Sequence, residues 1–246
     1  MSSGEIKRRE FLTFCGAGAL SSLLASCQLG PINIGGGGSP LPYPARPSST
    51  PTDGDWSSLA KSLQGMLVRP DSPQYMTAQQ LFDPRYDNVQ PQAIAYCSSP
   101  EDVQNCLALV RRFNLPFAPR CGGHSYVGYS TSKGLIIDVT KMNTVNVNTG
   151  NTTATIGAGT RLIDVYAALT QQGLILPAGS CPSVGIAGLT LGGGAGVLDR
   201  KFGLTCDNML SAQVVTADGR ILTCDASHNS DLFWALRGGG GGNFGV

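Results

Sequence analysis

Two glycine-rich segments constrain this chain most, Pro119–Ser125 (Pro-Arg-Cys-Gly-Gly-His-Ser) and Gly179–Gly185 (Gly-Ser-Cys-Pro-Ser-Val-Gly). Each places a nucleophilic side chain, His124 or Cys181, among glycines. Adjacent glycines permit positive φ angles and let backbone amides point together toward a phosphate anion. An imidazole or a thiol can in addition bond covalently to an electrophile. The two segments therefore predict a site that holds a phosphate-bearing group and attaches it covalently.

Composition bounds the class of protein. The chain has 246 residues, 41% of them hydrophobic, which is enough for one or two domains. Its formal net charge of +1 gives no argument for a nucleic-acid partner. The 33 glycines cluster in a few places, as turns and ligand-binding loops require, which low-complexity sequence would not show.

The N-terminus has the features of an export signal. Arg8 and Arg9 precede a mildly apolar run that is too short for a membrane span, and this indicates a signal peptide over residues 1–27. The paired arginines resemble a twin-arginine signal, and Leu-Ala-Ser-Cys ending at Cys27 resembles a lipobox, with lipidation of Cys27. An ordinary signal peptide with a chance cysteine is the alternative. We expect export to a bacterial cell envelope, either with a lipid anchor in the membrane or as a secreted protein.

Residues 28–55 are rich in Gly, Pro and Ser, a composition that cannot bury a core. We expect the leader and this linker to be disordered, with the linker acting as a tether. Eight cysteines in an exported chain would ordinarily suggest four disulfides. Half of them lie in the leader or in the two glycine-rich segments, so disulfides are not the default expectation, although a pair such as Cys206 with Cys224 stays open. The cysteine spacing does not match a zinc site, and we expect no metal.

The rest of the chain alternates between helical and strand patterns, which predicts an α+β fold. Leucines at helical spacing suggest a helix within 56–68, the start of a lead-in over 56–90. Ser99 is a good N-cap for a helix with Pro100 in its first turn. Further helices are predicted over 160–171 and 231–237, with Asn229 or Ser230 capping the last one, and strands over 92–97, 116–119, 135–139, 152–157, 212–216 and 220–223. Asp218-Gly219 predicts a two-residue hairpin turn between the last two strands.

Together with the C-terminal run from Asp231 to Val246, the two glycine-rich segments resemble the berberine-bridge-enzyme-like oxidoreductases. Their FAD-binding domain is of the p-cresol methylhydroxylase (PCMH) type. The resemblance covers 91–246 and implies two α/β subdomains that clasp FAD. In relatives a substrate domain follows this sequence, so the chain resembles the cofactor half of an enzyme. A separately encoded substrate domain is then one conceivable partner.

The resemblance also assigns the two nucleophiles. Arg-x-Gly-Gly-His-Ser implies a bond from His124 to the flavin 8α carbon, and Gly-x-Cys-Pro-x-Val-Gly implies a bond from Cys181 to flavin C6. A lone histidine is more often an ordinary polar side chain, and a free cysteine often packs as a small hydrophobe. Val184 corresponds to the family residue that gates dioxygen, although valine is also an ordinary packing choice. The other residues expected along FAD by this resemblance are Arg120, Cys121, Gly122, Gly123, Ser125, Gly179, Gly185, Gly188, Gly192, Gly193, Gly194, Gly196, Asp207, Asn208, Gly242, Asn243, Phe244, Gly245 and Val246.

Gly240–Gly245 formally matches G-x-G-x-x-G but follows a predicted helix, whereas a Rossmann turn follows a strand, so we reject that match. The implied activity is an FAD-linked oxidase acting on alcohol groups of sugars or other small molecules, with dioxygen as the acceptor. No catalytic base is assigned, because relatives use a tyrosine from the substrate domain, and Tyr126 and Tyr129 fit a core or rim role better. The competing hypothesis is a non-catalytic flavin-binding lipoprotein or a truncated product.

Overall fold

The computed structural model describes residues 50–246. The predicted signal peptide with Cys27, and most of the predicted linker 28–55, lie outside the described residues. Within 50–246, no helix combines the length and the apolar character that a membrane crossing requires.

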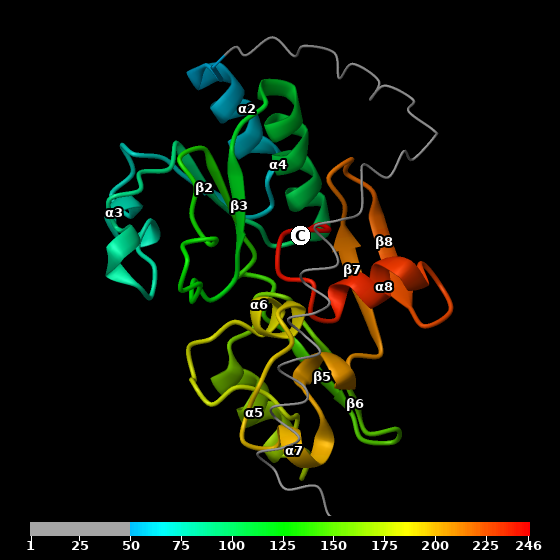
Figure 1. Cartoon of the computed structure of the whole chain (residues 1–246). Helices are drawn as coiled ribbons and strands as arrows, with labels where there is room; N and C mark the ends of the chain where they lie inside the picture. Colours follow the sequence, from blue (N-terminus) through cyan, green and yellow to red (C-terminus); the bar gives the residue numbers. More distant parts are fainter. Residues whose placement is uncertain (1–49) are drawn as a thin grey trace, which may run out of the picture. The chain divides into compact units, whose positions relative to one another are not determined.

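A four-stranded sheet forms the first part of the fold (Figure 1). Its strands follow the order β1-β2-β4-β3, with β1 antiparallel to β2 and the other three strands parallel. The central strand is buried along its whole length, as the apolar run of a parallel sheet predicts. Three of the predicted strands are confirmed with small shifts at their ends. The bounds are β1 (Met66–Val68), β2 (Ala93–Tyr96), β3 (Phe117–Arg120) and β4 (Leu135–Asp138).

Helices cover both faces of this sheet. On one face lie α2 (Asp53–Ser62) and α4 (Pro100–Phe113), and on the other α3 (Tyr75–Ala78), followed by the 3-10 turn η1 (Pro84–Tyr86). The predicted cap of α4 is confirmed, because the Asp102 amide donates to Ser99 Oγ at 3.3 Å. The predicted inward face of α4 is buried: Val103, Cys106, Leu107 and Val110.

The helix predicted within 56–68 is shorter than expected, because α2 ends at Ser62 and the chain continues into β1. Tertiary contacts set this end. The fully buried Asp102 carboxylate accepts hydrogen bonds from the amides of Gln64 at 2.7 Å and Gly65 at 3.0 Å. These bonds hold the chain extended where the leucine spacing alone favours a longer helix.

The second part of the fold contains a small antiparallel sheet under a helix. Its elements are β5 (Val145–Asn148), β6 (Thr153–Ile156), α5 (Leu162–Thr170) and α6 (Ile186–Leu191). The sequence predicted β6 and α5, whereas β5 and α6 were missed. Val165 and Leu169, predicted to face inward from α5, are buried in the apolar cluster of this part.

A second hairpin and short helices complete the fold: α7 (Asp199–Phe202), η2 (Thr205–Asn208), β7 (Ser211–Val215), β8 (Ile221–Asp225) and α8 (Ser230–Leu236). The predicted hairpin is confirmed, but the prediction of a two-residue turn is wrong. The Thr216 amide donates to the Arg220 carbonyl at 2.9 Å, which leaves three residues in the loop. Gly219 has φ +86° while Asp218 is not among the positive-φ residues, so the two left-handed positions of a type I′ turn are not present.

Candidate functional site

The two glycine-rich segments meet backbone to backbone at Gly122 and Gly185. A Cβ atom on Gly122 would lie 2.4 Å from the Gly185 amide nitrogen, and one on Gly185 would lie 2.0 Å from the Cys121 Sγ atom. Any side chain larger than hydrogen at either position would force the segments apart. The structure thus places the two predicted nucleophile segments in direct contact and shows why both positions are glycine.

The second segment is held in place by the start of α5. The Leu162 amide donates to the Val184 carbonyl at 2.9 Å, and the Ile186 amide donates to the Thr160 carbonyl at 2.9 Å. The Val184 side chain packs against the apolar cluster around α5. These two bonds tie the C-terminal end of the segment that carries Cys181 to the start of α5.

The Ser183 hydroxyl joins the two nucleophiles. Its Oγ atom lies 2.9 Å from His124 Nε2 and 3.7 Å from Cys181 Sγ. All three side chains are half-buried. Ser183 was not predicted, although it stands between the two predicted residues Cys181 and Val184 and is the small polar residue of that stretch.

His124 is neutral at neutral pH. Partial burial, and then the positive charge of Arg161, lower the pKa of His124 below its ordinary value of 6.5. Its ring stacks on Phe82, with centroids 4.0 Å apart and planes inclined by 20°. A neutral imidazole has one nitrogen with a free lone pair, and this is Nδ1 when Nε2 donates to the Ser183 hydroxyl. In that tautomer Nδ1 is a competent nucleophile.

The two cysteines near the contact differ in chemistry. Burial raises the pKa of Cys121 to about 11, so this thiol stays protonated near neutral pH and is a poor nucleophile. Cys121 packs beside Gly185 and against the core of the first sheet. Cys181 contacts the Ser183 hydroxyl, and of the two it is the thiol placed to react.

The third predicted segment, at the C-terminal end, lies beside the first. Gly242 has φ +80°, and a Cβ atom there would lie 2.9 Å from Pro119 Cγ, at the end of β3. Val246 pairs with Val215, with N–H···O distances of 2.8 and 3.0 Å. Figure 1 shows the C-terminal segment in red between β3 and β7. Three segments distant in the sequence therefore converge at one end of β3.

Other predicted residues have local structural roles. A Cβ atom on Gly194 would lie 2.3 Å from Thr205 Oγ1, and one on Gly196 would lie 2.0 Å from the Ala178 carbonyl. Asp207 accepts the Leu204 amide at 2.8 Å. Packing and turn formation explain these residues without a ligand, so their predicted contact with the cofactor stays a prediction.

The remaining predicted positions spread over several elements. Asn208 and Asn243 donate to nearby carbonyls, and Ser125 accepts the Tyr129 amide at 3.0 Å. Gly188 is open, because a methyl group at its Cα would have no neighbouring atom within 4 Å. The other positions lie in turns or at element ends: Gly123, Gly179, Gly192, Gly193, Phe244 and Gly245.

Arg120 points into the domain. Its Nε atom lies 2.6 Å from Asp138 Oδ2, with the two side chains 5% and 3% exposed, and its Nη1 atom is buried with no hydrogen-bond partner among residues 50–246. The pair ties the end of β3 to the end of β4, directly before the glycine turn. Asp138 was not predicted, because nothing in the sequence near Arg120 identifies its partner.

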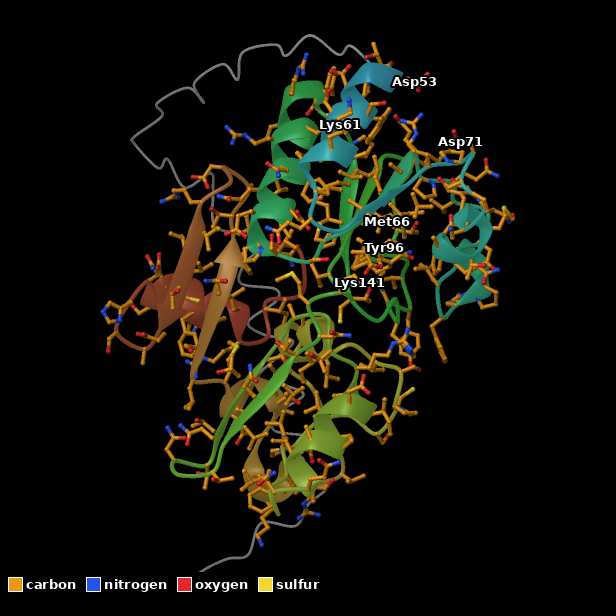
Figure 2. All side chains as sticks on the ribbon, turned by 180° about the vertical axis from the view of Figure 1, so that it is seen from behind. Asp53, Lys61, Met66, Asp71, Tyr96 and Lys141 are labelled. Atoms are coloured by element: carbon orange, nitrogen blue, oxygen red, sulfur yellow. The ribbon has the colours of Figure 1, made fainter. Side chains whose placement is uncertain are left out.

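A cavity of about 700 Å³ lies elsewhere in the molecule. Met66, Tyr96 and Lys141 line it and are labelled in Figure 2, which views the molecule from behind. Neither nucleophile is among its lining residues, although Arg161, which influences His124, borders it. The cavity is therefore not the contact region of the two nucleophiles.

Cys206 and Cys224, left open as a disulfide pair, are both free thiols. In the part of the chain that the structure describes, no three His, Cys, Asp or Glu side chains are grouped as a metal site would need. Tyr126 and Tyr129 are 74% and 76% exposed, in keeping with a rim position.

Comparison with known proteins shows which family of proteins the chain matches. A family model described as "FAD binding domain" matches residues 91–225. The FAD-linked oxidoreductase YgaK of Bacillus subtilis is 41% identical over 189 residues, covering 75% of this chain and 42% of that protein.

Two solved structures are similar. BBE-like 1 of Physcomitrella patens has a TM-score of 0.74 at 38% identity, covering 78% of this chain and 42% of that one. Glucooligosaccharide oxidase from Acremonium strictum, described with a 6-S-cysteinyl, 8α-N1-histidyl FAD, has a TM-score of 0.71 at 34% identity, covering 78% and 41%. The chain thus spans about two fifths of the length of each of these relatives.

Proposed function

Because the chain belongs to the family of FAD-linked oxidoreductases that share this FAD-binding domain, we propose that it holds FAD through two covalent bonds, from His124 and Cys181. One observation carries this proposal: both side chains contact the same hydroxyl, that of Ser183. The C6 and 8α positions of a flavin lie along one edge of its ring system. Two nucleophiles gathered at one hydroxyl suit two neighbouring attachment points.

The residues present fit the cofactor. Gly123 adopts φ +70° next to Gly122, the backbone geometry that turns successive amides toward an anion such as a pyrophosphate. A neutral imidazole and a thiol are nucleophiles that suit covalent attachment to carbon. Among the described residues, no cluster of His, Cys, Asp and Glu side chains would draw them into a metal site instead. The buried thiol of Cys121, protonated at neutral pH, does not compete with Cys181.

Each side chain has a distinct role in this proposal. His124 supplies a lone pair without first losing a proton, because its lowered pKa keeps it neutral. Phe82 stacks on the ring and limits its rotation. Gly122 and Gly185 let the two segments approach closely enough for both nucleophiles to reach one ligand. Arg120 and Asp138 anchor the strand ends from which the first segment departs.

We further propose that the natural substrates are alcohols, with saccharides as the first class to test and dioxygen as the electron acceptor. Similarity to glucooligosaccharide oxidase supports this choice. Bound FAD supplies the two-electron oxidation chemistry that none of these side chains can provide. The catalytic base is unassigned, since the tyrosines near the first segment are exposed at the rim.

Acid precipitation tests the attachment. Purified protein is expected to keep its yellow colour in the acid pellet, with an intact mass raised by one FAD. His124→Ala and Cys181→Ala should each retain one bond, and the double variant should release all of its flavin. Cys121→Ala is the matched control and should retain both bonds. Complete release of flavin by the unaltered protein would overturn the proposal.

A peroxide assay over mono- and oligosaccharides tests the reaction. Sugar-dependent peroxide that disappears in the double variant is the expected result. Tightly held flavin with no peroxide for any alcohol would instead favour the non-catalytic flavin-binding hypothesis.

Export is proposed from the N-terminal sequence. Changing Arg8 and Arg9 together to lysine should retain the protein in the cytoplasm, since twin-arginine export depends on the arginine pair. Cys27→Ala should abolish incorporation of a labelled fatty acid. Unchanged export of the double-lysine variant would indicate the general secretory route instead.

A further inference from the structure

We propose that Ser183 is a positioning residue that sets the proton arrangement of both nucleophiles at once. In this arrangement His124 Nε2–H donates to Ser183 Oγ, and the Ser183 hydroxyl donates to Cys181 Sγ. The inference rests on the proposed function, because it concerns how the two bonds to FAD form.

The geometry leaves three proton arrangements. The 2.9 Å contact engages Nε2, and Nδ1 has no hydrogen-bond partner within residues 50–246. The Ser183 hydroxyl carries one proton and can therefore donate to only one of its two neighbours. The chain of hydrogen bonds can run from histidine through serine to sulfur or from sulfur through serine to histidine, or the hydroxyl oxygen can accept from both Nε2–H and S–H and donate to neither.

The arrangements differ in which nitrogen of His124 holds the lone pair and in whether the Cys181 sulfur accepts or donates a hydrogen bond. When the chain runs from His124 to Cys181, Nδ1 keeps a free lone pair and the sulfur accepts a hydrogen bond. When it runs the other way, Nδ1 carries the imidazole proton and the Cys181 S–H is engaged as a donor to Ser183. Only the first arrangement leaves Nδ1 with its lone pair and also supplies the sulfur with a hydrogen bond, so a single hydroxyl prepares both nucleophiles together.

The Ser183 hydroxyl is held where it can do this. The neighbouring Pro182 carbonyl accepts the Ile163 amide at 3.1 Å. On the other side of the same residue, a Cβ atom on Gly122 would lie 2.8 Å from the Ser183 carbonyl. The backbone that carries the Ser183 hydroxyl is thus fixed between α5 and the first glycine turn.

Each attachment exchanges two bonds to hydrogen for one new bond to carbon. Attachment of His124 replaces its N–H bond and one C–H bond of the flavin 8-methyl group by an N–C bond. Attachment of Cys181 replaces its S–H bond and the flavin C6–H bond by an S–C bond. In each case dioxygen takes up two electrons and two protons and becomes hydrogen peroxide. The proton lost from His124 is the one on Nε2; it leaves through the Ser183 hydroxyl, which gives up its own proton in exchange, and it ends in the hydrogen peroxide.

Ser183→Ala removes the hydroxyl, Ser183→Thr keeps it, and Ser180→Ala is a control at an exposed serine in the same segment. Protein prepared without flavin would be mixed with FAD in air, and covalent FAD followed by intact mass after acid quenching. Ser183→Ala should slow both attachments by roughly 100-fold, the lower end of what a positioned proton-transfer group contributes. Ser183→Thr and Ser180→Ala should attach FAD at rates close to that of the unaltered protein.

Non-covalent FAD affinity, measured by flavin fluorescence, should be nearly the same in all four proteins, which separates attachment from binding. Two results would overturn the inference: Ser183→Ala attaching FAD at the original rate, or Ser183→Ala slowing only the cysteine bond. Nitrogen NMR of the flavin-free protein gives an independent readout. It should show the Nε2–H tautomer of His124, and a mixture of tautomers in Ser183→Ala, even if the proposed covalent function fails. The Nδ1–H tautomer in the unaltered protein would also overturn the inference.

Discussion

His124 Nε2 and Ser183 Oγ lie 2.9 Å apart, although 59 positions separate the two residues in the sequence. The contact exists because Gly122 and Gly185 allow their segments to touch. The chemistry of this site therefore depends on two residues that carry no side chain.

The glycine contact gives the first prediction. Gly185→Ala should destabilise the protein by about 3 kcal/mol, because its methyl group would overlap the Cys121 sulfur and the Gly122 backbone. Urea unfolding measures the change. Gly188→Ala is the matched control: no atom crowds that position and it lies in α6, so alanine should stabilise by about 0.5–1 kcal/mol. Equal stability of the two variants would contradict the contact.

Gly188→Ala also tests one predicted cofactor position. The substitution leaves the fold unstrained, so any loss of FAD affinity must come from the cofactor surface. Weaker FAD binding at unchanged or higher stability would place the cofactor against α6. Unchanged affinity would remove Gly188 from the predicted cofactor contacts.

The buried ion pair gives a third prediction. Asp138→Ala should cost about 3–5 kcal/mol, because it leaves the Arg120 charge buried without a partner. Asp218→Ala, which breaks the exposed pair with Arg220, should cost much less, because water solvates both of these charges. Chemical denaturation of the two variants makes the comparison. If Asp138→Ala lowers the free energy of unfolding only slightly, water solvates Arg120 better than its 5% exposure indicates.

The pH dependence follows from His124. Its pKa is lowered in the folded protein, so the unfolded chain takes up this proton first as the pH falls. The contribution of His124 to the free energy of unfolding should be fully present above about pH 6.5 and should decline below it, down to the folded pKa. Subtracting the pH profile of His124→Gln isolates this contribution. Proton NMR gives the pKa directly, since the chain has only two histidines.

Alkylation distinguishes the two cysteines near the site. With its pKa raised to about 11, Cys121 should react with iodoacetamide about tenfold faster for each pH unit between 7 and 10. Peptide mass spectrometry on flavin-free protein follows the reaction residue by residue. Rapid modification of Cys121 at pH 7 would show that water reaches its thiol and that burial does not raise its pKa.

Much of the fold follows from local sequence. The strands β2, β3 and β4 were predicted closely because each is a short apolar run between turn residues, and α4 because Ser99 and Pro100 define its start. The end of α2 was missed because the Asp102 carboxylate, distant in the sequence, sets it. β5 was missed although its residues alternate.

The residues of the candidate site also divide into those predicted from local motifs and those that depend on tertiary partners. Its nucleophiles were predicted because their residue types stand in recognisable motifs, and the structure brings them together without testing their bonds to FAD. Ser183 and Asp138 were not predicted, since their importance comes from partners that only tertiary packing supplies. The turn at Gly219 was misjudged because Asp-Gly suits both two-residue and three-residue loops.

The meeting of Gly122 with Gly185 has a consequence for folding kinetics. In the proposed function, both nucleophiles reach one ligand only after a long loop has closed, a non-local step that is slow compared with helix formation. Covalent flavin would then accumulate only on chains that have completed this closure. The fraction of polypeptide carrying the added mass would be a permanent record of how many molecules had reached the native state, readable even after the protein is denatured.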